Sequence, residues 1–213
     1  YKKRGGNVLW VGHPMIDLTK KLPLKTDARN ILNLRPDQNI ILLMPASRPQ
    51  ELRYLLPTFM KVAKNLQQKY PSLVVYIPSC RNAFDEIFKK AFRKYQVKGF
   101  VISQKDSAKL KPYIYSLTKI ALCKSGTVNM ELALYGIPQI VGYRVSRVTA
   151  FIAKKILNFK VRFISPVNLL VNKLIIPEFV QREFDEKKIF YKSCRILDGK
   201  SEKIKIKKGY AFL

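Results

Sequence analysis

Short runs of consecutive apolar residues alternate along this chain with longer segments in which apolar residues recur every three or four positions. Apolar runs of this length are typical of strands buried on both faces, and they lie at 39–45, 72–78, 99–103, 119–123 and 138–143. The intervening segments have the period of amphipathic helices, and they lie at 49–70, 83–95, 107–118 and 127–136. The alternation predicts an α/β fold with a doubly wound parallel sheet.

The regular alternation ends near Val145, and the rest of the chain has a different composition. A further amphipathic helix is predicted over 146–159, followed by an apolar segment that contains two prolines. We expect the compact α/β unit to span 36–182 and a basic, helical C-terminal tail to span 183–213. Because the sequence begins without Met, we also expect an upstream domain to precede it.

Charge narrows the choice of partners. The chain has 41 Lys and Arg residues against 14 Asp and Glu, which gives a formal net charge of +27. Such a charge suits nucleic acid, an anionic lipid surface or phosphorylated small molecules. The basic residues are spread along the chain without the dense block of a nucleic-acid tail, and a bias of composition toward Lys, Ile and Asn would produce the same charge without any function.

Cysteine usage and hydropathy exclude several classes of protein. The three cysteines are far apart in the sequence, which fits neither a disulfide framework nor the ligand spacing of a zinc site. We therefore expect a reducing compartment. No apolar run approaches the roughly 20 residues that a membrane-spanning helix needs.

Two predicted loops carry polar residues at the carboxyl ends of strands, where open α/β sheets bind ligands. In the second loop, KSGTVNME, Ser125 and Thr127 offer hydroxyl groups, and Gly126 lets a ligand approach the backbone. The helix that follows begins with free N–H groups that favour an anion. Glu131 lies about one helical turn beyond Thr127, where it would accept hydrogen bonds from a sugar. This arrangement suits a nucleoside diphosphate.

The first loop, PASRPQE, adds a cation. Arg48 follows Ser47 at a strand exit and precedes Pro49, a residue suited to the first position of a helix. The guanidinium of Arg48 would therefore face an anion held at the second loop.

Each of these features also has a purely structural interpretation. Ser125 or Thr127 would serve as a helix N-cap with Glu131 as its capping-box partner, although the spacing is one residue longer than usual. Arg48 would be a solvated surface charge. The residues by themselves leave both interpretations open.

Four stretches together carry a resemblance to a known family: GHPMID at 12–17, LLMPASRPQELRYLLPTFM at 42–60, LCKSGTVNMELALYGIPQIVGYRVS at 122–146 and NLLVNKLIIPEFVQ at 168–181. In order and spacing they resemble the C-terminal half of lipid-A-disaccharide synthases. The resemblance implies the Rossmann-like C-terminal domain of a GT-B type glycosyltransferase. Residues 1–35 would then be the crossover from the missing N-terminal domain, and 36–182 the UDP-sugar-binding domain.

The activity that this resemblance implies is an inverting sugar transfer. The enzyme would move 2,3-diacylglucosamine from UDP-2,3-diacylglucosamine to 2,3-diacylglucosamine 1-phosphate, releasing UDP and forming the β-1,6 disaccharide of lipid A. No metal or other cofactor is expected, so helix N-termini and basic side chains would neutralise the diphosphate. The general base would lie in the upstream half, and we interpret His13 as orienting a turn.

The resemblance carries nine residues to the UDP-sugar site: Ser47, Arg48, Ser125, Gly126, Thr127, Glu131, Asn168, Glu178 and Gln181. Glu131 corresponds to the glutamate that binds the ribose, and the last three would line the donor cleft, although a helix cap is an ordinary alternative for an asparagine or glutamine. Two departures from the family pattern bear on the donor geometry. Ala46 replaces the usual glycine, and Val167 separates Pro166 from Asn168.

The expected partners are the acylated donor, the acylated acceptor and an anionic membrane surface on the cytoplasmic side, or in the stroma of an organelle. We do not expect nucleic acid as a partner, and a homodimer is left open. One alternative is another UDP-hexosamine glycosyltransferase. A second is a non-catalytic domain that binds nucleotide or polyanions through its charge, for which UDP binding would not depend on Arg48.

Overall fold

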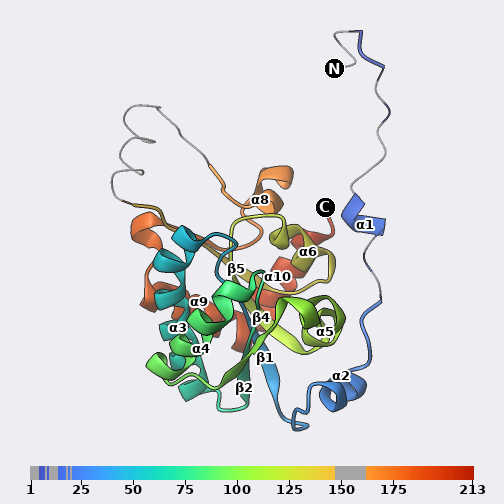
Figure 1. Cartoon of the computed structure of the whole chain (residues 1–213). Helices are drawn as coiled ribbons and strands as arrows, with labels where there is room; N and C mark the ends of the chain where they lie inside the picture. The colour runs from blue at the N-terminus through green and yellow to red at the C-terminus, as the bar shows by residue number, and fades with distance from the viewer. Residues whose placement is uncertain (1–4, 8, 10–13, 18, 20, 147–161) are drawn as a thin grey trace.

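The computed structural model describes residues 5–7, 9, 14–17, 19, 21–146 and 162–213, and within them six strands form one parallel sheet (Figure 1). The strands are β1 (Asn39–Met44), β2 (Leu73–Pro78), β3 (Gly99–Ile102), β4 (Thr118–Lys124), β5 (Gln139–Tyr143) and β6 (Glu178–Val180). The first five coincide with the predicted apolar runs. β6 was not predicted, because three residues beside Pro177 show no alternation.

The strand order is β3-β2-β1-β4-β5-β6, and each neighbouring pair is parallel. The chain moves outward in one direction from β1 and then returns to begin again at β4. The neighbours β1 and β4 are therefore the place where the direction reverses, the topological switch point of a doubly wound sheet. The predicted fold class is confirmed.

Helices cover both faces of the sheet. The described helices are α1 (Pro14–Asp17), α2 (Lys25–Ile31), α3 (Pro49–Lys69), α4 (Asn82–Tyr95), α5 (Gln104–Leu117), α6 (Val128–Leu134), α8 (Pro166–Val171), α9 (Glu186–Asp198) and α10 (Lys200–Tyr210), with a 3-10 turn at Gln181–Glu183. The short α1 lies beside α6 and does not cover the sheet. Figure 1 shows α3, α4 and α9 on one side of the strands and α2, α5 and α6 on the other. The helix expected over 146–159 and His13 lie outside the described residues.

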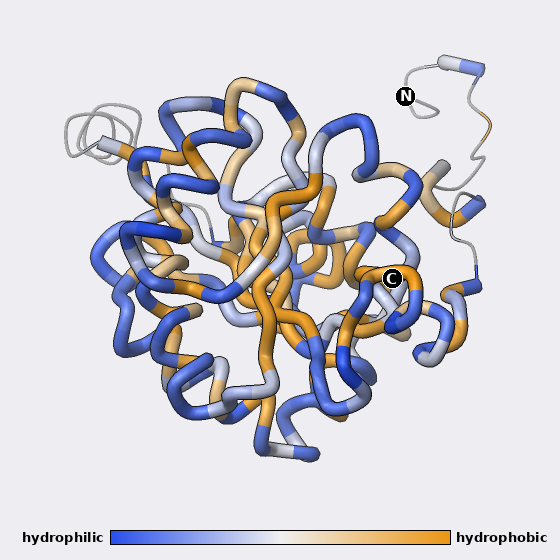
Figure 2. The backbone as a smooth tube through the Cα atoms, turned by 60° about the horizontal axis from the view of Figure 1, so that its bottom comes forward, coloured by the Kyte–Doolittle hydropathy of each residue, from blue (hydrophilic) through white to orange (hydrophobic). Residues whose placement is uncertain are grey.

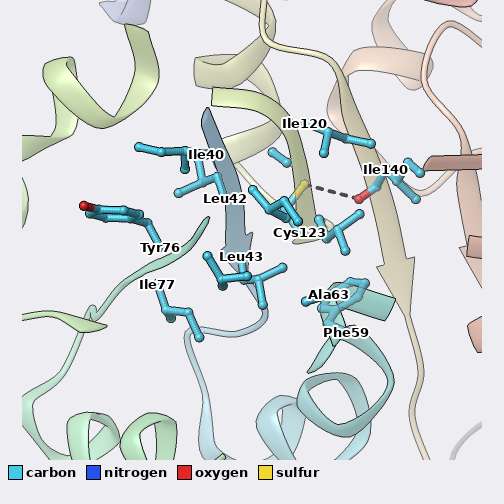
Figure 3. Close-up of a cluster of buried hydrophobic side chains, with 14 of the residues drawn as sticks. Ile40, Leu42, Leu43, Phe59, Ala63, Tyr76, Ile77, Ile120, Cys123 and Ile140 are labelled. Carbon is cyan, nitrogen blue, oxygen red and sulfur yellow. Dashed lines mark hydrogen bonds between the residues drawn. The ribbon is translucent and has the colours of Figure 1, made fainter. Parts of the chain in front are cut away.

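The core lies between these layers. Figure 2 shows the central strands as the hydrophobic part of the backbone, with hydrophilic helical segments around them. β1 explains why: Ile40, Ile41, Leu42 and Leu43 are all fully buried, as in a strand covered on both faces. Their side chains meet those of α3, β2, β4 and β5 in the cluster of Figure 3.

The core extends beyond the expected limits of 36–182. At the N-terminal side, α2 packs against α5 and buries Ala28. At the C-terminal side, 183–213 is helical but is not a tail, because Ile189, Ile206 and Tyr210 join the main cluster. The heavy charge of this segment concealed its buried positions. No helix in the described part of the chain is long and apolar enough to cross a membrane.

The turn at Gly136 determines how the chain enters β5. Gly136 has φ +65°, the left-handed conformation that glycine adopts without strain. Its N–H donates to the carbonyl of Ala133, and the next N–H, of Ile137, donates to the carbonyl of Leu132. Gly136 is thus a C′ glycine, and it ends α6 just before β5 begins.

Candidate functional site

The loops after β1 and β4 leave the sheet side by side at the switch point. In the sheet, Met44 at the end of β1 is in register with Cys123 of β4, and Lys124 is in register with Gly142 of β5. The three strands therefore end at nearly the same level. The predicted loops 45–51 and 124–131 start from this common edge, as the rule for open α/β sheets requires.

A pocket of about 400 Å³ opens between these loops and the one after β5. We call it the switch-point pocket, and its lining residues are Arg48, Gln50, Glu51, Arg53, Tyr54, Leu55, Lys124, Ser125, Tyr143, Arg144, Val145 and Ser146. Four of these residues are cations, one is an anion and two are aromatic. The balance of charge favours an anionic ligand, and the tyrosines offer flat surfaces beside it.

The single carboxylate of the lining, Glu51, organises the pocket from inside. Its Oε2 accepts hydrogen bonds from the backbone N–H groups of Ser47 (2.9 Å) and Arg48 (3.1 Å), and its Oε1 accepts from Nζ of Lys124 (2.9 Å). One side chain in the first turn of α3 thus ties the β1 loop to the end of β4. The sequence analysis did not single out either Glu51 or Lys124 for the site.

Electrostatics keep Glu51 ionised in this position. Partial burial by itself would raise the pKa of the carboxyl group, but hydrogen bonds from the backbone of Ser47 and from Lys124 outweigh that effect and lower the pKa below its usual value. The ion pair is largely enclosed, with side-chain exposures of 21% for Lys124 and 25% for Glu51. Within the described part of the chain, the other three cations of the lining, Arg48, Arg53 and Arg144, form no ion pair.

The turn from β4 into α6 is held by side chains on its inner side. Oγ of Ser125 donates to the carbonyl of Ile164, and the N–H of Gly126 donates to Oδ1 of the buried Asn129 at 2.8 Å. Thr127 stands at the N-cap of α6, but its side chain makes no capping hydrogen bond. Thr127 therefore occupies the expected N-cap position without a capping hydrogen bond from its side chain, and Asn129 supplies the local hydrogen bond instead.

Comparison with known proteins identifies the family. A family model described as lipid-A-disaccharide synthetase matches residues 1–211. The chain belongs to this family.

Individual lipid-A-disaccharide synthases support the assignment. The chain is 44% identical over 210 residues to the lipid-A-disaccharide synthase of Prochlorococcus marinus (strain MIT 9313), covering 99% of this chain and 54% of that protein. It is 37% identical over 197 residues to that of Gloeothece citriformis (strain PCC 7424), covering 92% of this chain and 50% of that protein. The chain thus spans about half the length of the curated relatives it matches.

The fold also has relatives among solved structures. WaaG, a glycosyltransferase involved in lipopolysaccharide biosynthesis, superposes with a TM-score of 0.65 at 9% identity, covering 94% of this chain and 49% of that chain. At this identity the likeness concerns the fold, and it agrees with the GT-B type expected from the family.

The residues that the synthase motifs assign to the donor are not all in one place. Arg48 and Ser125 line the switch-point pocket, and Ser47 contacts its organising carboxylate. Glu131 is partly buried on α6, where Oε1 accepts from Nζ of Lys111 on α5 at 2.9 Å. The capping-box interpretation of Glu131 has no support, because its carboxylate pairs with this lysine of α5. Whether these residues bind UDP stays a prediction.

Asn168 and Glu178 stabilise the segment 164–178 in this synthase-family fold. Asn168 is fully buried: its Oδ1 accepts from the N–H groups of Ile175 and Ile176, and its Nδ2 donates to the carbonyl of Ile176 and to Glu178. The carboxylate of Glu178 also accepts from the backbone N–H groups at 164 and 165. Neither side chain lines the switch-point pocket. Through these contacts, Asn168 and Glu178 hold the segment 164–178 in its conformation.

Gln181 neither lines the switch-point pocket nor belongs to the segment 164–178, but it contacts the pocket wall. With its amide oriented to donate to the carbonyl of Val145, it also accepts from the N–H of Val145, both at 3.3 Å. Val145 lines the switch-point pocket, so Gln181 supports the pocket wall through the backbone. Of the two departures from the family pattern, Ala46 has no positive φ and needs no glycine, and Val167 is fully buried in the first turn of α8.

Three pocket cations and two aromatic residues escaped the sequence analysis: Lys124, Arg53, Arg144, Tyr54 and Tyr143. Lys124, Tyr143 and Arg144 lie at or next to a predicted strand end, and that position was the available signal. Arg53 and Tyr54 lie inside α3, and no local signal marked them. Among the described residues, no group of three or more His, Cys, Asp or Glu side chains is placed to hold a metal ion. The expectation of a metal-free site stays a prediction.

Proposed function

We propose that this chain is the donor-binding half of a lipid-A-disaccharide synthase, and that the switch-point pocket holds the UDP moiety of UDP-2,3-diacylglucosamine. The observation that carries the proposal is the convergence of two family motifs, represented by Arg48 and Ser125, on one cationic pocket. Membership of the family supports the reaction class. The acceptor would be 2,3-diacylglucosamine 1-phosphate.

The diphosphate would lie between the β1 loop and the turn that begins α6. Arg48 would contact the phosphate oxygens, while Lys124, already neutralised by Glu51, would mainly keep the two loops at a constant separation. A methyl group at Gly126 would meet only Lys124, at 3.5 Å, so no close protein contact requires glycine there. The open side of Gly126 leaves room for the diphosphate to approach the backbone.

The site would provide binding and charge neutralisation, with no metal. The hydroxyl oxygen of the acceptor attacks the anomeric carbon, the bond from that carbon to the diphosphate oxygen breaks, and UDP leaves with the electron pair. The configuration inverts, and the hydroxyl proton passes to a base that we place upstream of this chain. Cations of the lining such as Arg48 and Arg144 would stabilise the negative charge that develops on the leaving UDP.

The chain would work at an anionic membrane surface on the cytoplasmic side, where acylated substrates are available. Its net charge of +27 supports this proposal, because each basic side chain near an anionic leaflet contributes about 1 kcal/mol.

Calorimetric titration of UDP into the 213-residue chain tests the proposal. We expect saturable one-to-one binding at moderate salt, and we expect Arg48→Ala to weaken it by about tenfold or more, because a hydrogen bond to a charged group is lost. Arg93→Ala is the matched control: it removes the same charge from the exposed end of α4, near the opposite edge of the sheet. Equal weakening by both variants, or no saturable binding by the folded chain, would contradict the proposal.

The predicted contact of Glu131 with the ribose needs a second pair of variants. Glu131→Ala should weaken UDP binding, whereas Glu183→Ala, which removes an exposed carboxylate from the 3-10 turn, should not. A comparison of UDP with uracil and with inorganic pyrophosphate would separate the ribose contact from the others. If Glu131→Ala leaves UDP affinity unchanged, the role of Glu131 is limited to its ion pair with Lys111.

A further inference from the structure

A second pocket lies at the opposite edge of the sheet from the switch-point pocket. It has a volume of about 160 Å³ and includes Thr118 and Lys119 at the start of β4 and Pro138 just before β5. All the strands are parallel, so their starts lie at the edge away from the proposed UDP site. We call this cavity the N-edge pocket, and it has no part in the function proposed above.

Four lysines from three separate elements line the N-edge pocket: Lys25 of α2, Lys119 of β4, and Lys203 and Lys207 of α10. None of them forms an ion pair with a carboxylate among the described residues. The carboxylate nearest in sequence, Glu202, is already engaged by Lys192 and Arg195 of α9. The positive charge of the pocket is therefore not neutralised by the protein.

Both burial and the neighbouring positive charges lower the pKa of lysines in this pocket. Burial lowers the pKa of Lys119, and the neighbouring charges of Lys25, Lys203 and Arg29 lower it further. Burial also lowers the pKa of Lys203, with added repulsion from Lys207 and Lys25. Like charges held together at a partly buried place are unfavourable, and a bound anion would remove that cost.

We infer that the N-edge pocket is a binding site for a phosphate group, held by Lys119 and Lys203 with Lys25 and Lys207 at its rim. Lysine ammonium groups are point charges with three donors each and bind phosphate in many proteins. The volume is several times the roughly 30 Å³ that one water occupies, so a phosphate group fits. The phosphate would belong either to a soluble anion or to the headgroup of an anionic lipid.

Binding of inorganic phosphate tests the site directly. We would titrate phosphate into the whole chain at constant ionic strength and follow the amide resonances of Lys119 and Ile137 at the pocket by NMR. Saturable shifts are expected in the native chain, and Lys119→Gln with Lys203→Gln should weaken phosphate binding there by about tenfold or more. The matched control is Lys105→Gln with Lys109→Gln, which removes two exposed charges from the first half of α5 and should leave binding unchanged.

Thermal unfolding of the native chain and the double variant shows whether a loss of phosphate binding comes from a loss of stability. If the lysines repel one another, the Lys119→Gln and Lys203→Gln variant should unfold at the same or a higher temperature than the native chain when no phosphate is present. The proposal is overturned if this variant is less stable and the native chain shows no saturable phosphate shifts. The lysines would then only stabilise the C-terminal ends of α5 and α6 through the helix dipoles. Leu117 at the end of α5 and Tyr135 at the C-cap of α6 also line the pocket. Equal loss of binding in both double variants would likewise overturn it, by indicating diffuse charge.

Vesicle flotation distinguishes the two sources of phosphate. The chain would be mixed with vesicles of phosphatidylcholine alone or with added phosphatidic acid. A lipid headgroup as ligand predicts that the pocket variant loses flotation with phosphatidic acid far more than the control variant does. Equal flotation of the two variants, together with saturable phosphate shifts, assigns the pocket to a soluble phosphate.

Discussion

The switch-point pocket and the segment 164–178 both contain polar residues that the family motifs assign to the donor, yet they use these residues differently. In the pocket, Arg48 and Ser125 face a cavity at the end of the sheet. In the segment, Asn168 and Glu178 direct their side chains at backbone groups of the same loop. A motif residue near a site can therefore line the cavity itself or build the wall around it.

The largest expected effect concerns the interior of segment 164–178. Asn168→Ala would leave the N–H and the carbonyl of the buried Ile176 without their side-chain partner, whereas the N–H of Ile175 would keep its bond to the carbonyl of Lys173. We expect the free energy of unfolding to fall by about 3 kcal/mol. Chemical denaturation measures this loss. Asn30→Ala, at an exposed position on α2, is the control and should change stability by no more than about 0.5 kcal/mol. Similar losses of stability in the two variants would contradict the structural role of Asn168.

An intermediate effect is expected inside the switch-point pocket. Glu51→Gln breaks the ion pair with Lys124 and weakens the hydrogen bonds to the β1 loop, so we expect a loss of about 1–2 kcal/mol at neutral pH. The folded-state pKa of Glu51 is lowered, so its contribution is present above the unfolded pKa of about 4.3 and is lost as the pH falls through the folded value.

Denaturation at several pH values checks this sign. The difference in stability between native chain and Glu51→Gln should be full at neutral pH and should shrink below about pH 4. Glu183→Gln is the control with the same change in charge, because its ion pair with Lys188 is exposed and is worth little. A difference that grows as the pH falls would refute the assignment.

The smallest effect concerns the hydrogen bond that joins the two regions. Ser125→Ala removes the bond from its Oγ to the carbonyl of Ile164, and a loss of about 1 kcal/mol is expected. Ser201→Ala, exposed on α10, is the control. Hydrogen exchange gives a sharper readout: the amides of Ile164 and Ser165, which donate to Glu178, should exchange faster only in Ser125→Ala. Unchanged exchange would mean that the two regions are held independently.

Periodicity alone was sufficient for the central part of the fold. Continuous burial of β1 leaves no alternative to a strand covered on both faces, and the 21-residue helix α3 repeats its apolar positions over many turns. The same criteria missed β6 and the buried positions of α10, although a helical segment was expected there. Three residues are too few to show a period, and in α10 the buried Ile206 and Tyr210 stand among lysines.

The site was predictable only in part, for a related reason. Strand ends followed by Ser-Arg and Ser-Gly-Thr marked two loops, and topology placed both at one edge. The contacts between side chains could not be predicted from these local patterns. Glu51 and Lys124 are 73 positions apart in sequence, and nothing local to either residue requires their contact.

Local patterns were enough to predict the doubly wound sheet and the family, because buried strands, helical periods and ordered motifs each lie within short stretches of the chain. The arrangement in space was needed to show which polar residues line a cavity and which bond to backbone groups. It also brings together the four lysines of the N-edge pocket from α2, β4 and α10, which form no ion pair with any described residue. The physical reason is that electrostatic and hydrogen-bonding partners are set by distance in space, and the distant segments come together only when the core that binds them is packed.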